Sequence, residues 1–127
     1  MNINKSNIKH SEPIKHWVFP KLLPYTATSN LKFELEELFQ YKKSNFKEFD
    51  RNGSMMYEWC KYNQSITPYA YDLISYFHSS EFVRWLEDVT EIKGLIPDIH
   101  LHGAGYMRCG TGDSLKIHTD FNWQDDI

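Results

Sequence analysis

The chain has 127 residues, of which 41% are hydrophobic and 16% aromatic, and its formal net charge at pH 7 is −3. This length indicates one domain, and this composition excludes a disordered chain. The acidic balance argues against binding to nucleic acid through the phosphate backbone.

The N-terminal residues 1–13 are polar, and we expect them to form a mobile segment. They lack the apolar core of a signal peptide, and no later stretch approaches the roughly 18 apolar residues of a membrane span. The cysteines at 60 and 109 are isolated, which is typical of a reducing compartment. We therefore expect a cytoplasmic protein with no membrane partner.

The first elements are a short strand and a helix. Trp17, Val18 and Phe19 predict a strand that the prolines at 20 and 24 end. Asn30 is a candidate N-cap for a helix, because the apolar residues after it recur at helical spacing. These apolar residues are Leu31, Leu35, Leu38 and Phe39.

Residues 41–64 interleave basic and aromatic side chains, a pattern that surfaces for single-stranded nucleic acid also show. Acidic residues dilute the charge of this stretch, so strands and loops of the scaffold are the favoured interpretation. We expect no nucleic-acid partner.

Two further helices follow. Thr67 as N-cap and Pro68 at the first helical position predict the start of one helix. Ser79 or Ser80 begins the next helix, and Gly94 is expected to end it. The residues expected to be buried between the helices and the sheet are Leu35, Leu38, Leu73, Ile74, Val83, Leu86, Leu115 and Ile117.

After Pro97 the apolar residues alternate with polar ones, which predicts a strand that begins near Asp98. The stretches 106–109 and 115–118 predict two more short strands. Each glycine between these strands, considered alone, predicts a tight turn, and a bulge or a close approach of the backbone to a ligand is the alternative. These glycines are Gly103, Gly105, Gly110 and Gly112.

His118 and Asp120 are the strongest candidates for chemistry. Side chains at i and i+2 of a strand project to the same side, so both can reach one metal ion. One imidazole and one carboxylate are two of the three protein ligands that hold non-haem Fe(II) in oxygenases. A solvated edge strand is the alternative interpretation. Lys116 shares the predicted face, and Asn122 either orients a ligand from behind or belongs to a turn.

The run from Leu101 to Asn122, LHGAGYMRCGTGDSLKIHTDFN, resembles the Fe(II)/2-oxoglutarate-dependent dioxygenases, in the branch that is similar to prolyl 4-hydroxylases. Upstream, residues 16–20 resemble the opening strand of that family, and residues 82–98 resemble its helix and connector before the barrel. The resemblance implies that residues 14–127 are the N-terminal part of such a domain. The fold class is then mixed α/β and mainly β: N-terminal helices and the first strands of a double-stranded β-helix (jelly roll), incomplete at the C-terminus.

The resemblance also implies an activity, which is hydroxylation with Fe(II), O2 and 2-oxoglutarate as co-substrate, with ascorbate as the expected reductant. His118 and Asp120 would be metal ligands. The candidates for hydrogen bonds that orient these ligands, or for contacts with the co-substrate, are Asn122, Tyr106 and Lys116. The substrate class favoured by this branch is a prolyl group in a peptide or protein. Loops such as residues 41–64 can border the substrate entrance in this family.

Two parts of the family's site are missing from the sequence, because its second metal histidine and its basic 2-oxoglutarate anchor lie well downstream of His-x-Asp. We expect that a downstream segment or a second chain completes the barrel, and that the chain alone does not turn over 2-oxoglutarate at a family-like rate. Substitution by His100, His102 or Lys116 is the alternative within the chain. The competing hypothesis is an inactive or split jelly-roll fragment that acts as a binding or assembly module.

Overall fold

The computed structural model describes residues 1–42, 47–51, 54–59, 64–101, 105–114 and 117. Within them the chain forms three helices and five short strands. The helices are α1 (Tyr25–Lys42), α2 (Pro68–Phe77) and α3 (Ser80–Thr90). The strands are β1 (Ile8–His10), β2 (His16–Val18), β3 (Lys47–Arg51), β4 (Ser54–Trp59) and β5 (Tyr106–Arg108).

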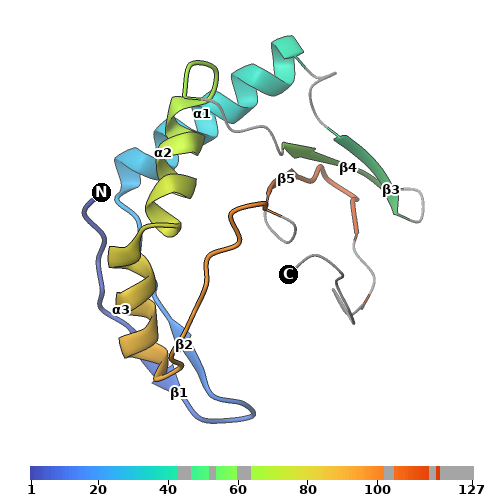
Figure 1. The fold of residues 1–127 in the computed structure, drawn as a ribbon. Helices are drawn as coiled ribbons and strands as arrows, with labels where there is room; N and C mark the ends of the chain where they lie inside the picture. The colour runs from blue at the N-terminus through green and yellow to red at the C-terminus, as the bar shows by residue number, and fades with distance from the viewer. Residues whose placement is uncertain (43–46, 52–53, 60–63, 102–104, 115–116, 118–127) are drawn as a thin grey trace.

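The helices lie along one side of the molecule, with the β1–β2 hairpin beside the end of α3 and the β3–β4–β5 sheet near the end of α1 (Figure 1). Both sheets are antiparallel. The described helices include none with the length and apolar character needed to cross a membrane.

The hairpin occupies the beginning of the chain. Its strand β2 is the strand predicted at residues 17–19, displaced by one residue. Its strand β1 lies inside residues 1–13, whose expected mobility stays a prediction. On one face of the hairpin the Lys9 ammonium lies 5.6 Å from the centre of the Trp17 ring, its cross-strand partner.

Helix α1 begins at Tyr25, so the prediction that Asn30 caps it was wrong. The carbonyl of Pro24 accepts the backbone N–H groups of Ala27 and Thr28 at 3.0 and 3.2 Å, which closes the first turn. Residues 25–30 are mostly polar or small, so this turn carries no apolar periodicity by which the sequence could have revealed it.

Helix α2 begins where Thr67 and Pro68 predict, with Pro68 at the first helical position. The Thr67 side chain makes no capping hydrogen bond. Instead the carboxylate of Glu34, on α1, accepts the N–H of Tyr69 at 3.0 Å and that of Ala70 at 2.8 Å. A negative charge at a helix N-terminus satisfies free N–H groups and the helix dipole together. Glu34 therefore both caps α2 and ties it to α1.

Helix α3 is capped from its own sequence, because the Ser79 hydroxyl accepts the N–H of Phe82 at 3.2 Å. The helix ends at Thr90, so the predicted end at Gly94 was wrong. Glu91 ends it instead, in the left-handed conformation with φ 62°. A glycine usually takes this position because it has no Cβ to clash there.

The burial predicted for the helical residues is confirmed for Leu38 and Leu73 and reached only in part by the others. Leu38 and Leu73 are buried, together with Ala70 and Thr67, and the other predicted helical residues are half-buried. These half-buried residues are Leu35, Ile74, Val83 and Leu86. The prediction for Ile117 was wrong, because its side chain is fully exposed at a bend, where the alternation of strand faces does not hold. Leu115 lies outside the described residues.

The strand predicted from Asp98 does not form at Ile99 and His100, where the chain turns. The Asp98 carboxylate accepts the N–H of His100 at 3.2 Å, and the Asp98 carbonyl accepts the N–H of Leu101 at 3.1 Å. Such a local side-chain bond offers the backbone an alternative to a strand ladder, which explains the failure of the alternation rule here.

The strand predicted at residues 106–109 is confirmed as β5. It pairs with β4, so that Tyr106 lies opposite Trp59 and Arg108 opposite Tyr57. The strand expected at 115–118 lies almost wholly outside the described residues. The mainly β jelly roll therefore stays a prediction.

Candidate functional site

Most of the predicted site falls outside the part of the chain that the structure describes. This holds for the metal ligands His118 and Asp120 and for the candidates Lys116 and Asn122. Tyr106 is described, and so is the chain that leads toward the motif. Of the alternative ligands, His100 lies in the turn after Asp98, and His102 is outside the described residues.

Tyr106 connects the sheet to the helices. It is half-buried, its ring packs against the buried Leu38 of α1, and its hydroxyl lies 3.5 Å from the carbonyl of Ala70 on α2. The structure therefore gives Tyr106 a packing role between α1, α2 and β5. Its role toward a co-substrate stays a prediction.

A turn ends β5 and leads the chain into the His-x-Asp segment. The N–H of Asp113 donates to the carbonyl of Gly110 at 3.2 Å, and the Asp113 carboxylate accepts the N–H of Gly110. Gly112 has φ 90°, a conformation that side chains rarely adopt. The tight-turn interpretation is thus confirmed for Gly110 and Gly112.

Arg108 is a residue that the sequence analysis missed. Its guanidinium lies 4.2 Å from the centre of the Phe39 ring, and its Nε is 3.5 Å from Glu36 Oε1. The Nε is buried, and among the described residues it has no hydrogen-bond partner, although the Glu36 carboxylate lies close by. Residues i and i+2 of a strand lie on one face. Because Tyr106 was a candidate site residue, the sequence could have indicated Arg108 as its neighbour on the same face.

A pocket of about 290 Å³ lies between α1 and β5. Its wall is apolar at Leu31, Leu35 and Met107, and charged at Lys32 and Arg108. Glu36 offsets part of this positive charge, and Tyr106 and Thr28 complete the lining. The volume is at the lower end of that of small-molecule sites.

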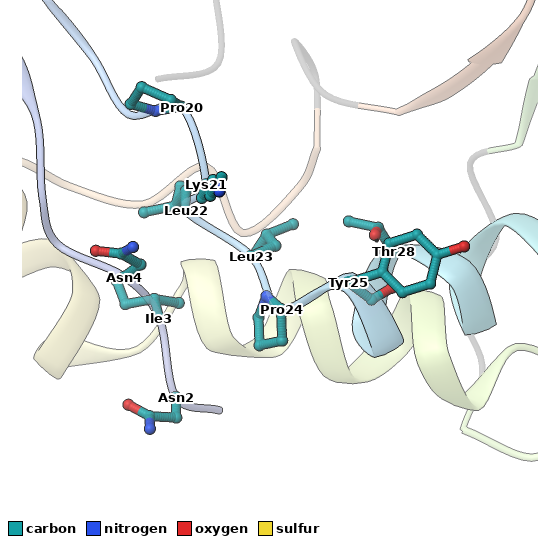
Figure 2. A pocket seen from close by; sticks show the side chains of 10 residues that line it. All are labelled: Asn2, Ile3, Asn4, Pro20, Lys21, Leu22, Leu23, Pro24, Tyr25 and Thr28. Carbon is teal, nitrogen blue, oxygen red and sulfur yellow. Dashed lines mark hydrogen bonds between the residues drawn. The ribbon is translucent and has the colours of Figure 1, made fainter.

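A larger pocket, of about 840 Å³, lies where the first residues run beside the loop before α1 (Figure 2). The N–H of Asn4 donates to the carbonyl of Leu22 at 2.9 Å and holds the two segments together. None of the predicted site residues lines this pocket, and Lys21 is the one side chain among its lining residues that is charged at pH 7.

One tyrosine in the helical layer has a shifted pKa. Burial raises the pKa of Tyr76 above its usual value of 10, and the negative charge of Glu81 raises it further. The ring of Tyr76 contacts Phe77 and Phe82 at centroid distances of 6.3 and 5.5 Å. Tyr76 therefore belongs to the aromatic packing between α2 and α3.

The donor types of the predicted centre, one imidazole and one carboxylate, suit Fe(II) chemically. Within the described residues no three histidine, cysteine, aspartate or glutamate side chains gather as a metal site. The assignment of His118 and Asp120 thus depends on their spacing and sequence context.

Comparisons of the chain with family models, with curated proteins and with solved structures found no match.

Proposed function

We propose that this chain carries the His-x-Asp half of the metal site of an Fe(II)/2-oxoglutarate-dependent hydroxylase. The observation that carries the proposal is the run from Leu101 to Asn122, in which a glycine-rich stretch leads into an aliphatic segment that ends in His118-Thr119-Asp120. In an extended backbone His118 and Asp120 project to one side and Thr119 to the other.

The described part of this run supports the proposal at one point. The resemblance implies a glycine-rich pair of strands before the metal segment, and strand β5 with the turn at Gly110–Asp113 fits the second strand of that pair. The first strand of the pair does not form at Ile99 and His100. The contacts of Tyr106 and Arg108 with α1 attach β5 to the helical layer, so the segment after the turn starts from a supported element.

The residues have separate roles in this proposal. The imidazole of His118 and the carboxylate of Asp120 hold the metal, and Asn122 orients a ligand from behind. Bound Fe(II) supplies the redox chemistry by which O2 and 2-oxoglutarate hydroxylate a substrate. We assign the third metal ligand and the 2-oxoglutarate anchor to a segment or partner chain outside these 127 residues.

Anaerobic Fe(II) titration of the full chain tests the proposal, with Asp120→Ala as the probe and Thr119→Ala as the matched control. The dissociation constant should rise at least tenfold in Asp120→Ala, because a carboxylate ligand is lost. In Thr119→Ala it should change less than twofold, because that side chain points away from the metal. Equal Fe(II) affinity of Asp120→Ala and the wild type would reject the assignment. A wild-type chain that binds no Fe(II) would favour the binding or assembly module.

A further inference from the structure

Two histidines face each other across the N-terminal hairpin. His10 on β1 and His16 on β2 are cross-strand partners, and their rings stack with centroids 4.7 Å apart and planes 11° from parallel. Directly opposed side chains of an antiparallel pair have closely spaced Cβ atoms. The backbone register therefore fixes the two imidazoles side by side.

A hydrogen bond selects the nitrogen that His16 can offer. His16 Nδ1 lies 2.8 Å from the carbonyl oxygen of Ile14, so this nitrogen carries the proton and donates it. The lone pair of the neutral ring is then on Nε2. Histidines that ligate metals commonly donate a hydrogen bond from their other ring nitrogen, which fixes the tautomer and the ring orientation.

The surroundings of the pair leave it accessible. The same face of the hairpin continues with the apolar pair Ile8 and Val18, while Lys9 and Trp17 project from the opposite face. The His10 ring is exposed, and among the described residues its ring contact is the stacking on His16. Its rotation about Cβ–Cγ therefore breaks little besides the stacking.

We propose that His10 and His16 form a binding site for a divalent transition-metal ion of borderline softness, such as Zn²⁺. In the stacked state the two lone pairs lie in nearly parallel planes, so they do not converge. Rotation of the His10 ring, with His16 held by Ile14, lets a His10 nitrogen and His16 Nε2 bind one metal ion, each at the roughly 2.0–2.1 Å of a Zn–N bond. Imidazole ligands select Zn²⁺, Ni²⁺ or Cu²⁺ over Mg²⁺ or Ca²⁺, and water completes the coordination.

This site is independent of the proposed iron centre, because His10 and His16 lie on the first hairpin and neither belongs to that centre. The test is a titration of the full chain with Zn²⁺ alone at pH 7.5, followed by the imidazole nitrogen resonances of each histidine. The His10 and His16 resonances should shift together at the lowest Zn²⁺ concentrations, before those of His78. A chain in which His78 shifts at the same concentration as His10 and His16 would overturn the proposal.

Substitutions distinguish the loss of a metal ligand from a disturbance of the hairpin fold. His10→Gln should weaken Zn²⁺ binding at this site at least tenfold, and Lys9→Gln, on the same strand but the opposite face, should change it less than twofold. His10→Cys should retain binding, because a thiolate is also a zinc ligand. If His10→Gln binds as tightly as the wild type, or His10→Cys as weakly as His10→Gln, the pair is not the site. The Asp120→Ala variant should retain Zn²⁺ binding at the hairpin even though it loses Fe(II) binding.

Discussion

Helices α2 and α3 follow each other in the chain, and both begin after a hydroxyl-bearing residue, but their N-termini are satisfied in different ways. Ser79 caps α3 with its own hydroxyl, which accepts the N–H of Phe82. Thr67 makes no such bond, and Glu34, from α1, accepts two N–H groups of α2. The start of α3 is thus held locally, whereas the start of α2 depends on the packing of two helices.

The largest effect should follow from Glu34→Gln. An amide offers one weaker acceptor where the carboxylate accepts two N–H groups, and the charge at the α2 N-terminus is lost. We expect the free energy of unfolding to fall by about 1.5–3 kcal/mol, the range of hydrogen bonds to charged groups. Urea unfolding followed by circular dichroism measures this loss. Glu37→Gln, at an exposed position of the same helix, is the control and should change stability by less than about 0.5 kcal/mol.

A smaller loss should follow from Ser79→Ala, which removes the local cap of α3. We expect a loss of about 1 kcal/mol in the same urea experiment. Ser80→Ala, one position into the helix and exposed, should be nearly neutral. If Ser79→Ala lowers the free energy of unfolding by more than Glu34→Gln does, the contrast between a local and a tertiary cap is reversed.

The smallest effect should be a gain, from Glu91→Gly at the end of α3. Glutamate there has φ 62°, which glycine adopts without a steric penalty. We expect stabilisation of about 0.5–1 kcal/mol, less the entropy that glycine adds to the unfolded chain. Thermal unfolding compares it with Glu91→Ala, which keeps the Cβ and should show no gain. Equal midpoints for the two variants would contradict the strain at Glu91.

The same contrast between local and distant causes explains which parts of the fold could be predicted. The starts of α2 and α3 were predicted because Thr67-Pro68 and Ser79 are local signals. The cap from Glu34 was missed because 35 residues separate it from Tyr69, and single-sequence patterns do not report such pairs. At Asp98 a local signal was present but was outweighed in the prediction by the apolar alternation that follows.

The candidate site shows the same division. The turn at Gly110 and Gly112 was predicted because the turn chemistry lies in the residues themselves. The stacking of Arg108 on Phe39 was missed because a strand and a helix far apart in the sequence create it. Whether His118 and Asp120 converge depends on the course of a segment outside the described residues, and their spacing is the evidence for it.

The most direct test of the central claim is the NMR spectrum of the chain with Fe(II), recorded anaerobically. A histidine bound to paramagnetic Fe(II) shows strongly shifted ring-proton signals. In a His10→Gln background, in which the proposed hairpin site cannot contribute, the account predicts such signals with and without Thr119→Ala, their loss in His118→Gln, and their change or loss in Asp120→Ala. Shifted signals that persist unchanged in both His118→Gln and Asp120→Ala would show that Fe(II) binds elsewhere and would contradict the proposed site.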